Sequence, residues 1–183
     1  MRHPLEFVHH SSRKAFFFTF LLLTLILFAV FRVLDAPLQT EYAPNGIVSF
    51  ELAGSPQNAA HIVLTWSEGA VLNAAFGLGI DYLFMPLYAF ALAFGTLRAA
   101  GRHAGWLRSL GAAAGYGAFA APLFDAVENY ALFQVLLGAF DSSYPALAAA
   151  CAAIKFGLIA FGLIYAILAG VIPGVVKRWI REF

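Results

Sequence analysis

The residues of this 183-residue sequence that could do chemistry are charged side chains set in otherwise apolar stretches. There are five of them: Arg32, Asp81, Asp125, Glu128 and Lys155. A charge in the middle of a membrane-spanning helix costs about 2.5–3.5 kcal/mol, so each one is expected to pair with another group or to serve a site. Amides accompany the acids, because Asn73 shares a helical face with Asp81, and Asn129 directly follows Glu128.

Two kinds of chemistry fit this set. Two carboxylates within hydrogen-bonding reach can share a proton and activate water. Carboxylates with nearby counter-charges can instead bind a small ligand, a lipid headgroup, a cation or a proton. The alternative is internal pairing, in which Lys155 and Arg32 neutralise two carboxylates and hold the helices in register. Three acids face two cations, however, which leaves one acid protonated, hydrated or open to a ligand.

The composition places the chain in a bilayer. It is 62% hydrophobic and 11% charged, whereas an ordinary soluble domain is roughly 25% charged. The formal net charge of +1, without a basic run outside the helix flanks, gives no indication of a nucleic-acid partner. A single cysteine, Cys151, excludes an intramolecular disulfide and a dithiol mechanism run by this chain alone.

Four apolar stretches are long enough to cross a hydrocarbon core of about 30 Å. They cover about residues 15–34, 69–97, 106–138 and 146–172. The predicted fold is therefore all-α, a bundle of four transmembrane helices that makes 1–183 a single integral membrane domain. The first stretch is interpreted as a retained anchor helix, because the apolar region of a signal peptide is only about 7–15 residues long.

Residues 35–67 form the connection between the first two spans. Val48, Phe50 and Leu52 alternate with polar residues, which predicts a short extended piece. Ser55 followed by Pro56 is typical of a helix start. Apolar residues at helical spacing after it predict a short amphipathic helix in the membrane interface, with a covered loop as the alternative.

The distribution of basic residues predicts the topology. Nine of the eleven Lys and Arg precede the first span, lie in the 98–108 turn or follow the fourth span, as Lys177, Arg178 and Arg181 do. The opposite side carries acids, including Asp141 in the last turn. The positive-inside rule then places both termini in the cytoplasm of a multi-pass cell-membrane protein. His3, His9 and His10 are interpreted as part of a polar cytoplasmic tail.

Two resemblances bear on function. GIVSFELAG and LGIDYLF, within about residues 47–90, resemble a pattern of small bacterial four-helix membrane proteins without an assigned function, and this resemblance implies no activity. Four spans with acids in the outer half are also similar to bacterial lipoprotein signal peptidase. LNAAFGLGIDYLF departs from the aspartate motifs of that family, so no catalytic role is carried over.

The predicted function is binding or transport in a polar cavity in the outer half of the membrane, covered by residues 35–67. Asp81 is the expected central acid, and Lys155 and Arg32 are the expected counter-charges. The remaining predicted ligand-binding residues are Asp125, Glu128, Asn73 and Asn129. Neither a metal nor a cofactor is predicted, because no His lies within a span. An accessory subunit of a larger membrane complex is the first alternative, and an acid-dyad hydrolase is the second.

Overall fold

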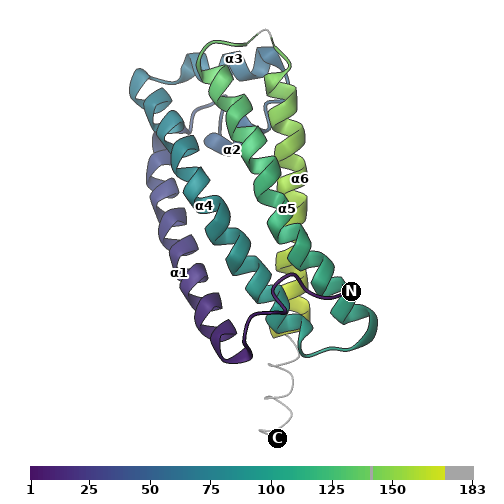
Figure 1. Ribbon diagram of the computed structural model, residues 1–183. Helices are drawn as coiled ribbons and strands as arrows, with labels where there is room; N and C mark the ends of the chain where they lie inside the picture. The colour runs from purple at the N-terminus through teal and green to yellow at the C-terminus, as the bar shows by residue number, and fades with distance from the viewer. Residues whose placement is uncertain (141, 172–183) are drawn as a thin grey trace, which may run out of the picture. The chain divides into compact units, whose positions relative to one another are not determined.

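The fold is known from a computed structural model, which describes residues 1–140 and 142–171 (Figure 1). These residues form helices and no strand, so the all-α prediction is confirmed for this part of the chain. The elements are α1 (His10–Asp35), η1 (Ala36–Leu38), α2 (Ile47–Glu51), α3 (Pro56–Thr65), α4 (Glu68–Ala100), α5 (Gly105–Leu136), α6 (Tyr144–Tyr165) and η2 (Ala166–Val171). Asp141, the end of the predicted fourth span and the basic residues of the C-terminal tail lie outside the described residues.

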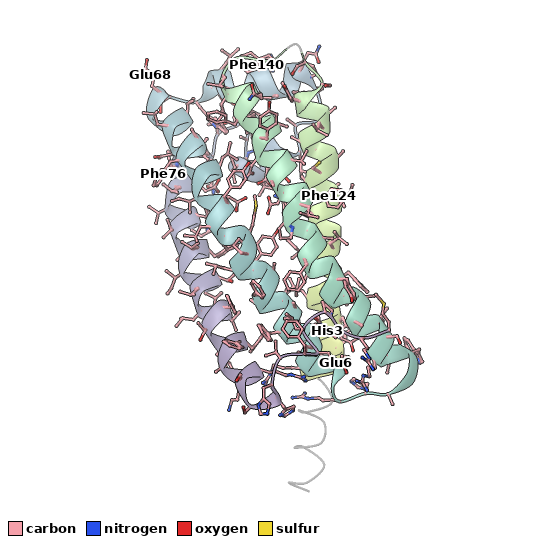
Figure 2. The ribbon with its side chains drawn as sticks, in the orientation of Figure 1. His3, Glu6, Glu68, Phe76, Phe124 and Phe140 are labelled. Atoms are coloured by element: carbon pink, nitrogen blue, oxygen red, sulfur yellow. The ribbon has the colours of Figure 1, made fainter. Side chains whose placement is uncertain are left out.

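Four helical segments are long and apolar enough to cross a membrane, as predicted. They are His10–Leu38, Glu68–Ala100, Gly105–Leu136 and Tyr144–Gly170. No residue of α1 is buried, and large apolar side chains such as Phe76 of α4 point outward (Figure 2). An apolar outer surface of this kind is what a hydrocarbon environment requires.

The chain divides into two compact units. Unit 1 contains Met1–Thr24, Pro86–Pro122 and the described residues from Phe156 onward, and unit 2 contains Leu25–Met85 and Leu123–Lys155. In α4 and α5 the boundary between the units falls at a proline, Pro86 and Pro122 respectively. Proline has no backbone N–H to donate, so each helix lacks one internal hydrogen bond there.

Unit 1 contains the N-terminal segment, packed against α4 and α5. Leu5 joins Leu92, Phe94 and Ala118 in an apolar core. His3 is buried, and its Nε2 lies 3.1 Å from Oγ1 of Thr96 (Figure 2). The interpretation of His3 as part of a polar tail was therefore wrong. The backbone N–H of Leu5 donates to His3 Nδ1 and fixes the ring. The polar residues around His3 in the sequence could not indicate that its side chain is buried.

Unit 2 is built around a core of thirteen buried residues, of which the connection 35–67 contributes six and the long helices seven. This core contains Leu38, Ala43, Phe50, Ala59, Ile62, Trp66, Ala70, Ala74, Leu78, Ala131, Leu132, Val135 and Ala148. The Trp66 indole N–H donates to the carbonyl oxygen of Leu38 at 2.9 Å, and the ring packs edge-on against Phe50. The connection is thus a packed part of unit 2.

The predicted extended piece at residues 48–52 is wrong, because Ile47–Glu51 is the short helix α2. Gly46 turns the chain with a φ of +57°, and the Asp35 carboxylate accepts the Ile47 N–H at 2.7 Å. The helix buries Phe50 and Glu51 on adjacent positions and leaves Val48 exposed, which a strand with alternating faces could not do. Without a neighbouring strand in the described residues, a helix satisfies these backbone groups internally.

The helix predicted after Ser55 is present as α3. The Ser55 hydroxyl accepts the backbone N–H of Asn58 at 3.2 Å, which is the usual N-cap contact. Ala59 and Ile62 are buried in the core of unit 2, whereas His61 is exposed. The position of α3 relative to the membrane interface stays a prediction.

Candidate functional site

Lys155 of α6 is the centre of a buried charge cluster in unit 2. Its Nζ donates to Glu128 Oε1 at 2.8 Å and to Asp125 Oδ1 at 3.0 Å, and it lies 3.7 Å from Glu51 Oε1. The exposed fractions are 5% for Lys155, 2% for Asp125, 0% for Glu128 and 9% for Glu51. We call these four residues the Lys155 cluster. It brings three carboxylates to one ammonium group.

Three helices position the cluster. Asp125 and Glu128 are three residues apart on α5, which puts both side chains on the same helical face. Lys155 of α6 donates to both of these carboxylates. Glu51 arrives from α2, whose start is fixed by the Gly46 turn and the Asp35 contact. The third carboxylate therefore depends on the fold of the connection.

A second polar contact continues from the cluster along α5. The Asn129 side-chain amide donates to Asp81 Oδ2 at 2.8 Å and to the Leu78 carbonyl oxygen at 3.3 Å. Asn129 is buried and Asp81 is partly exposed. Since Asn129 directly follows Glu128, the Asp81–Asn129 pair adjoins the Lys155 cluster on α5.

Five of the seven predicted ligand-binding residues therefore meet in these two contacts: Asp81, Asp125, Glu128, Asn129 and Lys155. The other two do not join them. Arg32 is exposed near the end of α1 and forms no ion pair within residues 1–140 and 142–171. Asn73 is partly exposed on α4, and no hydrogen bond within the described chain connects it to the cluster. The predicted ligand-binding roles of all seven residues stay predictions.

Glu51 is the site residue that the sequence did not reveal. The sequence feature that could have identified Glu51 is an acid placed directly between the apolar residues Phe50 and Leu52. The structure shows that this acid lies in the helix α2. Burial raises the pKa of the Glu51 carboxyl above its ordinary value of 4.5, although the Lys155 ammonium acts in the opposite direction. Burial therefore favours the neutral form of this side chain.

The cluster has more acid than base. Three carboxylates and one ammonium carry a formal charge of −2 when all are ionised. Two buried oxygens, Glu51 Oε2 and Glu128 Oε2, have no hydrogen-bond partner in the described part of the chain. An unpaired buried carboxylate oxygen is costly, and a proton on one of these acids would supply a donor. The arrangement is therefore suited to holding protons.

Within residues 1–140 and 142–171, no group of three or more His, Cys, Asp or Glu side chains could hold a metal ion. Comparison with known proteins adds no assignment, since no protein-family model, curated protein or solved structure matches this chain.

Proposed function

We propose that this chain is an integral membrane protein that binds protons in the Lys155 cluster and exchanges them with the outer side of the membrane. The supporting observation is the acid excess around Lys155, three buried carboxylates to one ammonium. The outward direction comes from the positive-inside pattern of the sequence. Intramembrane ionisable groups that exceed their counter-charges are typical of proton and ion pathways.

The two buried carboxylate oxygens without a hydrogen-bond partner favour a proton over a larger ligand. Glu51 Oε2 and Glu128 Oε2 are fully enclosed, and each can accept a hydrogen bond. A proton on either acid turns that acid into a donor without adding volume. The Asp81–Asn129 pair next to the cluster, where Asp81 is partly exposed, is the proposed route to water.

The acid-dyad hydrolase is the weaker alternative. The Lys155 ammonium binds both Asp125 and Glu128, at 3.0 and 2.8 Å. A dyad needs its proton between the two carboxylates, and here a fixed cation bridges those oxygens instead. The accessory-subunit alternative stays a prediction, because no specific contact supports it.

Infrared difference spectroscopy of the purified protein tests the proposal. Protonated carboxylic acids absorb separately from carboxylates, so pH titration of the wild-type protein should show an acid band that disappears at high pH. Glu51→Gln should remove much of this band and keep the fold, since the Gln amide carries its own hydrogens and can donate where the acid proton did.

Glu41→Gln is the matched control, because Glu41 is an exposed acid in the same connection. It should leave the titrating band unchanged. Proton release from liposomes that contain a pH-sensitive dye then separates transport from binding. A Glu51→Gln spectrum identical to the wild-type spectrum, together with an unchanged Glu128→Gln spectrum, would refute proton binding by the cluster.

A further inference from the structure

A basic pocket lies within unit 1, which contains no residue of the Lys155 cluster. Its volume is about 570 Å³. Its lining is His10, Ser11, Arg13, Lys14, Leu97, Arg98, Gly101 and Arg102. Four of these residues are Lys or Arg, and none of the eight is an acid. A pocket of this size and charge is suited to an anion.

Two helix ends bring the four charges together. Arg13 and Lys14 lie in the first two turns of α1, and Arg98 lies in the last turn of α4, shortly before Arg102. A cationic side chain at a helix C-terminus is stabilised by the helix dipole, which explains the position of Arg98. The two ends converge on one cavity in the same unit.

Within residues 1–140 and 142–171, no carboxylate forms an ion pair with these four side chains. Arg13 donates to the carbonyl oxygens of Glu6 and Val8, at 2.7 and 2.9 Å. Arg102 donates to the carbonyl oxygen of Gly170. The Arg98 guanidinium lies 5.4 Å from the centre of the Phe17 ring. Carbonyl groups and an aromatic ring orient a cation, but they carry no net negative charge.

We propose that this pocket binds a phosphate group, either of an anionic phospholipid or of a soluble phosphate compound. Guanidinium groups match the geometry of phosphate oxygens and bind them through paired N–H groups. Basic residues that flank membrane helices attract anionic headgroups, and each charge raises the affinity about fivefold. The predicted cytoplasmic position of this basic side would place the pocket at the level of the anionic lipids of that leaflet.

The test measures binding of two probes to the full-length protein. Native mass spectrometry of the protein in neutral detergent would compare phosphatidylglycerol with phosphatidylcholine, and calorimetry would measure inorganic phosphate. The variant Lys14→Gln/Arg98→Gln removes two charges and spares Arg13 and Arg102, whose side chains hold backbone carbonyl groups. Loss of two charges should weaken phosphatidylglycerol binding about 30-fold.

Two single variants control for folding and for general charge. Lys14 is exposed, so Lys14→Gln should fold normally and should weaken binding about fivefold. Arg2→Gln removes an equal charge outside the pocket and should have no effect of this size. Detergent melting of each variant checks that its fold is intact.

The outcomes separate the two sources of phosphate. Selective binding of phosphatidylglycerol that inorganic phosphate does not displace identifies a lipid phosphate. Displacement by millimolar inorganic phosphate identifies a soluble ligand. Equal binding of phosphatidylglycerol and phosphatidylcholine without phosphate binding, or Lys14→Gln binding as tightly as Arg2→Gln, overturns the proposal.

Discussion

Replacing Lys155 with Met should destabilise the protein strongly, because it removes the cation that three buried acids share. Lys155 Nζ lies 2.8, 3.0 and 3.7 Å from Glu128, Asp125 and Glu51. Met has a similar length and flexibility but no charge, so the change leaves little space and removes the ammonium alone. Removing one partner of a buried ion pair costs about 3–5 kcal/mol, and that is the expected loss of unfolding free energy at pH 8.

The loss of unfolding free energy in Lys155→Met should depend on the pH and on the number of acids left in the cluster. At low pH the acids can take up protons in place of the ammonium, so the Lys155→Met penalty should shrink. A second substitution, Glu128→Gln, should recover part of it at pH 8 and give a favourable coupling energy in a double-mutant cycle. The measurement is reversible unfolding in mixed detergent micelles, and Lys14→Met is the control because Lys14 is exposed. A Lys155→Met loss below about 1 kcal/mol at pH 8, without recovery by Glu128→Gln, would refute the reasoning.

Two further predictions concern His3 and Gly46. Burial lowers the pKa of His3 from 6.5 to about 4, so the folded protein binds fewer protons than the unfolded chain between these values. Its unfolding free energy should therefore fall as the pH drops from 6.5 to 4, by no more than about 3 kcal/mol, and His3→Gln should flatten this part of the pH profile. Gly46→Ala should cost about 1–3 kcal/mol in detergent unfolding, since φ is +57° and the new methyl group would overlap the Asp35 carboxylate. Gly79→Ala, which meets no atom within 4 Å, should change stability by less than about 1 kcal/mol, and an equal loss in both variants would contradict the argument for Gly46.

The features that could be predicted from the sequence are those that depend on neighbouring residues in the chain. Length and hydropathy identify the four spans, and the Ser55-Pro56 pair identifies the start of α3. The spacing of Asp125 and Glu128 puts both on one face of α5 whatever the rest of the chain does. Arg108 lies at the very start of the third span, so Lys155 is the only cation in the interior of the last two spans, which indicates that it would pair with these acids.

Features that depend on contacts between residues far apart in the chain could not be predicted from the sequence. Glu51 reaches Lys155 because Gly46 adopts a positive φ and because Asp35 accepts the Ile47 N–H from 12 positions away. The alternating pattern around Phe50 is equally typical of a strand, but the part of the chain that the structure describes offers no neighbouring strand for it to pair with. The depth of Asp81 along its helix likewise predicts a central position, yet its side chain contacts Asn129, whereas Lys155 binds Asp125 and Glu128.

The Lys155 cluster contains more acids than a structural ion pair needs. Holding two helices in register needs one acid for one lysine, and Asp125 or Glu128 alone would meet that need. The second acid of α5 and Glu51 of α2 add buried negative charge, which is costly unless protons or another cation neutralise it. A purely structural cluster would therefore become more stable when Glu51 is replaced with Gln and would lose nothing else. In a proton-binding cluster a proton already neutralises this charge, so Glu51→Gln would gain little stability and would lose the titration. The two accounts therefore separate on the unfolding free energy and the infrared spectrum of Glu51→Gln.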